Sequence, residues 1–302
     1  MLKRTKIIST DAYLAALKSK PVKNLIYLLC AASFLFGCND GPKTTKSAEV
    51  ETKAATSGAT DSAATPRSTS AAAASPQEII QKKQVPILCY HRIQDAGKPA
   101  DYTVLTNDFK VQMKLLADSG YKTVLPDQLH EYLTKGTALP EKPVMITFDD
   151  TRIEHHSIAA PEMEKYGFKG VFFVMTIPIG KPNYMNSEQI KDLSDRGHVI
   201  GSHTWDHHNV KKLQPEDWEK QISKPKLQLE KITGKPVEHF AYPFGIWNDT
   251  AVEELKKGGF KSAFQLTERR SQTEPIYTVR RTLVPGSWPN SVLLKRMNSF
   301  FQ

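Results

Sequence analysis

The feature that most constrains the fold is a repeated alternation of short apolar runs with amphipathic segments between residues 79 and 302. Strands that are apolar throughout and are separated by helices indicate a parallel sheet covered by helices. Seven or eight such units are enough to close a barrel, so we expect an α/β fold, a distorted (β/α) barrel of seven or eight parallel strands. The apolar runs of strand length are 85–90, 121–125, 143–148, 170–175, 198–202, 239–242, 260–265 and 277–284.

Segments with helical spacing lie between these runs, as at 109–117, 187–195 and 250–257. Ser187 is expected to cap the second of them. A longer helix is expected at 216–232, and Pro225 should kink or divide it because proline lacks the backbone N–H that a helix interior needs.

The N-terminal residues indicate that the protein is exported to the cell envelope. An uncharged run at 25–36 follows several lysines and is too short to span a bilayer, which is typical of a signal peptide. The run ends in Leu35-Phe36-Gly37-Cys38, which resembles the lipobox of bacterial lipoproteins. An ordinary signal peptide with a coincidental cysteine is the alternative.

Residues 39–78 are rich in Ala, Thr and Ser and almost lack large apolar side chains, so burial cannot offset the entropy of ordering them. The predicted organisation is a signal peptide with lipobox at 1–38, a disordered tether at 39–78 and a folded domain at 79–302. The protein is therefore expected to be exported and lipid-anchored to the bacterial cell envelope through Cys38, and so to have the membrane as a partner.

Charge and cysteine content exclude two other classes. Residues 79–302 contain 31 Lys and Arg against 26 Asp and Glu, with no dense cationic block, so we expect no nucleic-acid partner. Cys89 is the single cysteine of this region, which excludes a disulfide framework and predicts a buried core thiol. No feature indicates an obligate protein partner.

Residues that bind metals or transfer protons follow three of the predicted strands, and barrel enzymes carry their chemistry at strand C-termini. Asp149 and Asp150 follow one strand, and His203 and His207 follow another. An i, i+4 spacing can bring two imidazoles to one side of a helical turn, and one carboxylate completes a set typical of catalytic metal sites. Each part alone also has a structural explanation, as a helix cap or a core histidine.

Together these residues resemble the polysaccharide deacetylases with a NodB-homology domain, carbohydrate esterase family four, over about residues 84–285. The matching segments are Thr147-Phe148-Asp149-Asp150, His203-Thr204-Trp205-Asp206-His207 and Tyr242-Pro243-Phe244-Gly245. The second fits the family's H-[ST]-x-x-H motif, and the third resembles its proline-aromatic-glycine turn.

The resemblance implies a role for each matched position. Asp149 corresponds to the general base, while Asp150, His203 and His207 correspond to the ligands of a divalent metal. Zn²⁺ is the expected ion, with Co²⁺, Ni²⁺ and Mn²⁺ as alternatives. The backbone N–H of Phe244 corresponds to a donor that stabilises the oxyanion.

The chain departs from the family pattern at three places. Thr151 stands where a glycine usually follows the two aspartates, and Ala241 stands where an arginine usually orients the base. No histidine follows His239, so the usual C-terminal general acid is absent. Arg280 or Arg281, near the end of a late strand, is a candidate to replace the arginine.

Residues 85–92 resemble the branch of the family that deacetylates biofilm poly-N-acetylglucosamine, in which a strand-end histidine lies at the active site. His91 is therefore the candidate general acid, and packing under the barrel rim is the alternative. Trp205, Trp247 and Trp288 are candidates either for stacking on sugars or for filling the core. His130, His155, His156 and His198 have no motif support and are expected to be structural or surface residues.

The sequence thus predicts a metal-dependent hydrolase that removes N-acetyl groups from an N-acetylglucosamine-containing polysaccharide, by metal-activated water attack with Asp149 as general base. Two alternatives stay open. One is an O-acetyl esterase acting on xylan or peptidoglycan, which would use the same metal and water. The other is a catalytically decayed lipoprotein that binds polysaccharide without cleaving it.

Overall fold

The structure is a computed structural model and describes residues 74–266 and 269–301. The predicted signal peptide, Cys38 and most of the predicted tether lie outside the described residues. The first described helix, α2 (Pro76–Gln81), begins shortly before residue 79, and Ser75 and Glu78 form a reciprocal capping box at its start. Among the helices described, none combines the length and apolar character needed to cross a membrane.

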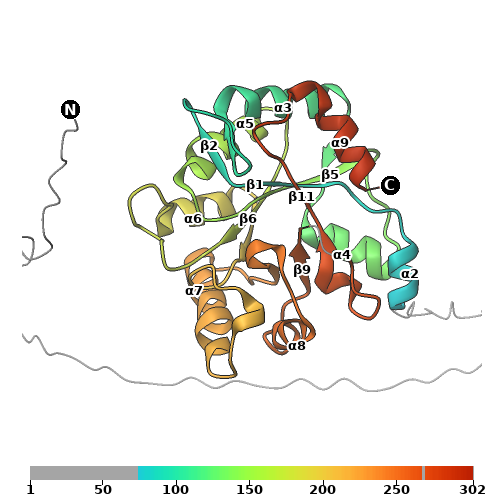
Figure 1. Ribbon diagram of the computed structural model, residues 1–302, viewed down its shortest axis with the longest axis vertical. Helices are drawn as coiled ribbons and strands as arrows, with labels where there is room; N and C mark the ends of the chain where they lie inside the picture. Colours follow the sequence, from blue (N-terminus) through green and yellow to red (C-terminus); the bar gives the residue numbers. More distant parts are fainter. Residues whose placement is uncertain (1–73, 267–268, 302) are drawn as a thin grey trace, which may run out of the picture. The chain divides into compact units, whose positions relative to one another are not determined.

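Eight parallel strands form a nearly closed barrel with helices around it (Figure 1). Neighbours along the sheet are β10, β9, β8, β7, β6, β5, β1 and β11. This arrangement confirms the predicted (β/α) barrel. The strands are β1 (Ile87–Tyr90), β5 (Pro143–Phe148), β6 (Val171–Val174), β7 (Val199–Ser202), β8 (His239–Ala241), β9 (Ser262–Gln265), β10 (Val279–Arg280) and β11 (Thr282–Leu283).

The barrel closes at a break in its last strand. Residues 277–284 were expected to form one strand, but the chain forms β10 and β11 with Arg281 between them. β10 pairs with β9, and β11 pairs with β1, so this one segment contacts both edges of the sheet. Arg281 therefore lies at the seam of the barrel, where its N–H donates to the Gln265 carbonyl at 3.1 Å.

Three short strands add to this frame. β4 (Lys122–Thr123) pairs with the first residues of β5 and is shorter than the run predicted at 121–125. β2 (Arg92–Gln94) and β3 (Thr103–Leu105) form a separate two-stranded parallel sheet that the sequence pattern did not predict. The β2 segment follows β1 directly and so lies near the carboxyl end of the barrel strands.

Helix boundaries follow local sequence signals. Asn186, and not the predicted Ser187, caps α6, because its side chain accepts the Gln189 N–H at 2.9 Å. Pro225 divides the predicted long helix into a π-helical turn at Glu219–Ser223 and the helix α7. The helices after α2 are α3 (Thr106–Asp118), α4 (Pro126–Lys135), α5 (Ala160–Glu164), α6 (Ser187–Asp195), α7 (Lys224–Thr233), α8 (Asp249–Lys257) and α9 (Leu293–Phe300).

Side chains on the two faces of each strand enter two different apolar clusters. Leu88 and Phe172 belong to the cluster that includes the buried apolar residues of α3, α6 and α8, so they lie between the sheet and these helices. Ile87 and Phe173 belong to the other cluster and face the barrel interior. Burial of each such side chain contributes about 1.5–3 kcal/mol to folding. At Gly201 a Cβ would lie 2.5 Å from the Phe173 ring, which explains the glycine in this strand.

Candidate functional site

The period-two alternation of the strands carries His91 and Asp149 to the carboxyl end of the barrel. Cys89 and Thr147 are paired residues of β1 and β5, and His91 and Asp149 are the next residues on the same faces. The Asp149 N–H donates to the Tyr90 carbonyl at 3.0 Å, which continues the ladder past the end of β5. As a result, His91 Nε2 lies 4.0 Å from Asp149 Oδ2.

Asp150, His203 and His207 converge at the same end of the barrel. The Nε2 atoms of His203 and His207 lie 3.6 and 3.5 Å from one oxygen, Asp150 Oδ1. One ligand atom from each of the three residues lies within 4.8 Å of the others. The chain between the histidines is not the predicted helical turn, because Thr204 and His207 both have a φ of 67°.

The hydrogen bonding of these residues leaves atoms available for a cation. His203 Nδ1 lies 2.7 Å from the Ala241 carbonyl, which can only accept, so Nδ1 carries the proton and the Nε2 lone pair is available. Over the described ranges, His203 Nε2 and Asp150 Oδ1 are buried and have no hydrogen-bond partner. Burial lowers the pKa of His203 to about 3, which keeps the ring neutral. Two neutral imidazoles and a carboxylate fit a divalent cation.

Arg281 holds Asp149 in a bidentate pair. Its Nη1 and Nη2 donate to Asp149 Oδ1 and Oδ2 at 2.7 and 2.8 Å, and Nη1 also donates to Thr147 Oγ1 at 3.1 Å. Burial acts to raise the pKa of Asp149, but the charge and hydrogen bonds of Arg281, together with the nearby imidazoles of His203 and His91, outweigh it and hold that pKa well below its usual range. Of the two predicted arginines, Arg281 makes this contact, whereas the Arg280 guanidinium lies 4.4 Å from the Phe300 ring centroid.

Backbone strain separates the two adjacent carboxylates. Asp150 and Thr151 have φ values of 77° and 59°, a region that non-glycine residues seldom adopt. Thr151, in the place of the family's glycine, compensates with its hydroxyl. Thr151 Oγ1 donates to the Met175 carbonyl at 3.0 Å and accepts the Met175 N–H at 2.8 Å. This bridge ties the end of β5 to the end of β6, while Asp149 faces Arg281 and Asp150 faces the imidazoles.

His91 is enclosed by groups that define its position. The His155 ring donates from Nε2 to the His91 carbonyl, and the Tyr102 ring stands edge-on at 5.0 Å between centroids. Burial lowers the pKa of His91, while the nearby carboxylates of Asp149 and Asp150 act in the opposite direction. Cys89, predicted to be a buried core thiol, is buried, but its Sγ lies 3.6 Å from Asp149 Oδ2. Residues two apart on a strand point to the same face, so Ile87, Cys89 and His91 share one face of the β1 segment. This spacing could have predicted that Cys89 lies next to His91 at the site.

Phe244 contacts the metal triad, the name used here for Asp150, His203 and His207, at the His207 ring. It forms part of a short 3₁₀ turn, Pro243–Gly245, and has a φ of 62°. Its ring stands 4.4 Å from the His207 ring centroid, and the side chain is 56% exposed. Gly245 also has a positive φ, and a Cβ there would lie 2.5 Å from Leu266 Cβ, so the turn requires a glycine.

Trp205, Trp247 and Trp288 are not among the residues that line the groove beside Asp150 and His207. Lys220 Nζ lies 3.9 Å from the Trp205 ring centroid, and Trp247 and Trp288 pack against the apolar cluster between sheet and helices. His155 and His198 are buried, as expected of structural residues.

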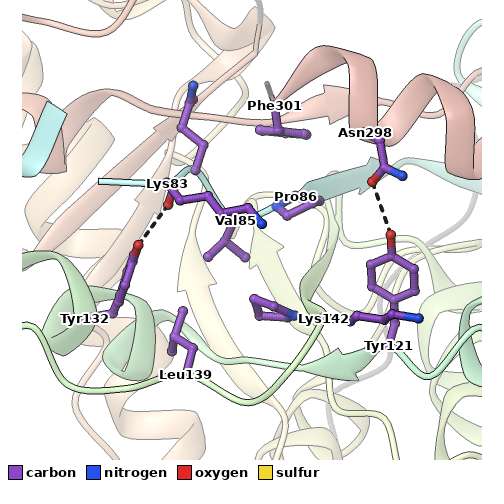
Figure 2. A pocket seen from close by; sticks show the side chains of 11 residues that line it. Lys83, Val85, Pro86, Tyr121, Tyr132, Leu139, Lys142, Asn298 and Phe301 are labelled. Carbon is purple, nitrogen blue, oxygen red and sulfur yellow. Dashed lines mark hydrogen bonds between the residues drawn. The ribbon is translucent and has the colours of Figure 1, made fainter. Parts of the chain in front are cut away.

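Two cavities lie at opposite ends of the barrel. A groove of about 580 Å³ includes Asp150 and His207 in its lining. A cavity of about 510 Å³ lies at the amino ends of β1 and β5, and Pro143 is part of its lining. Figure 2 shows Val85, Pro86 and Lys142 around it. The residues lining this second cavity include no carboxylate and no imidazole. The groove at the carboxyl end, in contrast, is lined by Asp150 and His207 of the cluster that could hold a metal ion.

Comparisons with known proteins agree with this geometry. A family described as polysaccharide deacetylase matches residues 136–263. The chain is 29% identical over 205 residues to YxkH of Bacillus subtilis (strain 168), covering 67% of this chain and 72% of that protein. It is 26% identical over 257 residues to the poly-beta-1,6-N-acetyl-D-glucosamine N-deacetylase of Staphylococcus aureus (strain MSSA476), covering 76% and 88%. The structure of IcaB from Ammonifex degensii superposes with a TM-score of 0.61 at 26% identity, covering 74% of this chain and 99% of that one.

Proposed function

Because this chain belongs to the polysaccharide deacetylase family, in the branch that resembles poly-N-acetylglucosamine deacetylases, we propose that it is a metal-dependent N-deacetylase. Its substrate is a polysaccharide that contains N-acetylglucosamine, and its products are acetate and the free amine. The observation that carries the proposal is the convergence of Asp150, His203 and His207 beside an Asp149 that Arg281 holds separately.

Asp150, His203 and His207 would hold the divalent ion, with Zn²⁺ as the first choice and Co²⁺, Ni²⁺ or Mn²⁺ compatible with the same ligands. Such an ion polarises the acetamido carbonyl and lowers the pKa of water. The Ala241 carbonyl orients His203 by accepting a hydrogen bond from its Nδ1. Because this contact uses the backbone of residue 241, it does not require the arginine side chain that the family usually has there.

Asp149 is the general base. Its depressed pKa keeps the carboxylate ionised, and the two hydrogen bonds from Arg281 fix the direction of both oxygens. Each carboxylate oxygen has a second lone pair, so Asp149 accepts a proton without breaking the pair with Arg281. The attack on the acetamido carbon requires this proton transfer because the nucleophile starts as water.

His91 is the general acid. Its Nε2 lies 4.0 Å from Asp149 Oδ2, on the same side of the site as the base. In its protonated form the imidazole donates the proton that the departing amine takes up. The hydrogen bond from His155 to the His91 backbone holds this residue in place. The Phe244 N–H, in the turn beside His207, supplies a donor for the oxyanion.

The departures from the family pattern have compensations, which supports an active enzyme over a decayed binding protein. Arg281 occupies the role that Ala241 cannot fill, and Thr151 sustains its positive φ with two hydrogen bonds. Both aspartates and both histidines of the motifs are retained.

Acetate release tests the proposal directly. The purified protein, loaded with Zn²⁺, should release acetate from poly-β-1,6-N-acetylglucosamine or chitin oligomers and little from acetylxylan. Release from acetylxylan, or from O-acetylated peptidoglycan but not from the same peptidoglycan after its O-acetyl groups have been removed, would instead assign an O-acetyl esterase. Glycan binding without release from any of the four would assign a decayed binding protein.

We also propose that the enzyme is exported and anchored to the cell envelope by a lipidated Cys38, with residues 39–78 as the tether. The uncharged run before Cys38 and the lipobox-like sequence support this location. Replacement of Cys38 by Ser should move the protein from the membrane fraction to the soluble exported fraction. Retention in the membrane fraction would contradict the lipid anchor.

A further inference from the structure

The groove beside the triad is lined by three cationic side chains. Arg92 comes from the start of β2, directly after β1, Arg152 follows the two aspartates after β5, and Lys181 lies in the loop after β6. Because β6, β5 and β1 are neighbours in the sheet, three consecutive loops each contribute one cation to the same groove of about 580 Å³.

These cations are poorly neutralised by the protein. Within the described chain, neither Arg92 nor Lys181 has an ion pair. Arg152 has one, in which its Nε lies 3.3 Å from Glu154 Oε1, and its guanidinium lies 4.9 Å from the Tyr184 ring centroid. The carboxylates in the groove lining are Asp150 and Asp206, and Asp150 is directed at the two imidazoles.

A neutral glycan gives no electrostatic reason for this arrangement. N-acetylglucosamine carries no charge, and each acetyl group removed leaves an ammonium that the three cations repel. Acidic groups on the glycan would be attracted to the three cations, and they would offset the repulsion of the ammonium groups. Arginine in particular presents a planar fork that binds carboxylate or phosphate through two hydrogen bonds.

We propose, on the basis of the deacetylase function above, that the substrate is an acidic polysaccharide, in which carboxylate or phosphate groups on the sugars bind Arg92, Arg152 and Lys181 while a neighbouring acetamido group is hydrolysed. The same cations disfavour a glycan that already carries amines next to the reacting sugar.

The test uses oligomers that differ at C6, with the methyl ester as the uncharged match for the carboxylate. β-1,4-linked N-acetylglucosamine pentamers, whose C6 hydroxyl groups are free, are compared in neutral form, with C6 oxidised to carboxylate, with those carboxylates methyl-esterified, and with the C6 hydroxyl phosphorylated. We expect the zinc-loaded protein to show a kcat/KM at least about fivefold higher for an acidic pentamer than for the neutral and esterified ones, mainly through KM. Added salt at 0.5 M should abolish most of this difference because it screens exposed charges.

Matched variants assign the effect to the groove. Arg92→Gln with Lys181→Gln should lower the ratio of kcat/KM, acidic over neutral, about three- to tenfold. Lys110→Gln removes an exposed lysine on α3, outside the groove lining, and should leave this ratio unchanged. The carboxylated and phosphorylated pentamers show which acidic group the groove prefers.

Failure of the acidic-substrate proposal and failure of the deacetylase function would give different results. Equal kcat/KM for neutral and acidic pentamers, or a preference that survives the double variant, would overturn the acidic-substrate proposal and leave the deacetylase intact. Absence of acetate release from all the pentamers and from poly-β-1,6-N-acetylglucosamine would overturn the deacetylase function itself.

Discussion

Arg281 and Asp149 are joined by two hydrogen bonds of 2.7 and 2.8 Å, although 132 residues separate them in the chain. The pair forms at the seam where the last strand segment joins β9 to β1. Closure of the barrel therefore also completes the site, because the residue at the seam is the one that orients the base.

Replacement of Arg281 by Lys should lower kcat about 100-fold with little change in KM, because a single ammonium cannot hold both carboxylate oxygens in place. Acetate release from a neutral N-acetylglucosamine pentamer measures the effect. Arg280→Lys is the matched control, since Arg280 contacts Phe300 and should leave kcat unchanged. Equal effects of the two substitutions would contradict an orienting role for Arg281.

His91→Gln should lower kcat for N-acetylated sugars about 100- to 10,000-fold, because the departing amine must be protonated. An aryl acetate, whose phenolate leaves without protonation, should lose less than about tenfold. His156→Gln serves as the control, because His156 pairs with Asp192 between helices. A loss of the same size for both substrates would show that His91 acts otherwise than as the acid.

Thr151→Val should reduce the free energy of unfolding by about 1–3 kcal/mol, because it leaves the buried Met175 N–H and carbonyl without their side-chain partner. Thr151→Ser keeps the hydroxyl and should cost less than about 1 kcal/mol. Urea unfolding at pH 7.5 measures both. Similar losses for Val and Ser would indicate that strain at the positive φ, and not the hydrogen bonds, decides the stability here.

Two structural histidines should make the protein less stable in mild acid. Burial lowers the pKa of both His155 and His198 to about 4, so between pH 6.5 and 4 the unfolded chain binds protons that the folded chain does not. Their contribution is complete above pH 6.5 and is lost as the pH falls toward 4. At pH 5 each should lower the free energy of unfolding by about 1–2 kcal/mol. Urea unfolding that gives the same value at pH 7.5 and pH 5 would contradict this.

Much of the fold follows from short-range patterns in the sequence. The apolar run at Pro143–Phe148 is a strand with the bounds that its composition predicts, and Pro225 divides its helix because of its missing N–H. The parallel barrel follows because such strands alternate with amphipathic helices. The β2 and β3 strands escaped prediction because three-residue strands such as Thr103–Leu105 are too short to show a period.

The site was predictable as a set of residue types but not in its geometry. The motifs name Asp149, Asp150, His203 and His207, yet the choice between Arg280 and Arg281 depends on where the last strand breaks. The position of that break is set by pairing with both β9 and β1, which no local pattern encodes. The left-handed turn at Thr204 and His207 likewise replaces the helical turn that the i, i+4 spacing suggests.

Metal content measured together with acetate release tests the central claim most directly. The zinc-loaded protein should retain about one divalent ion per chain after dialysis, Asp149→Asn should keep that ion but release no acetate, and Asp150→Ala should lose both. Retention of the ion by Asp150→Ala, or acetate release by Asp149→Asn at the rate of the unmodified protein, would contradict the division of roles between the two aspartates.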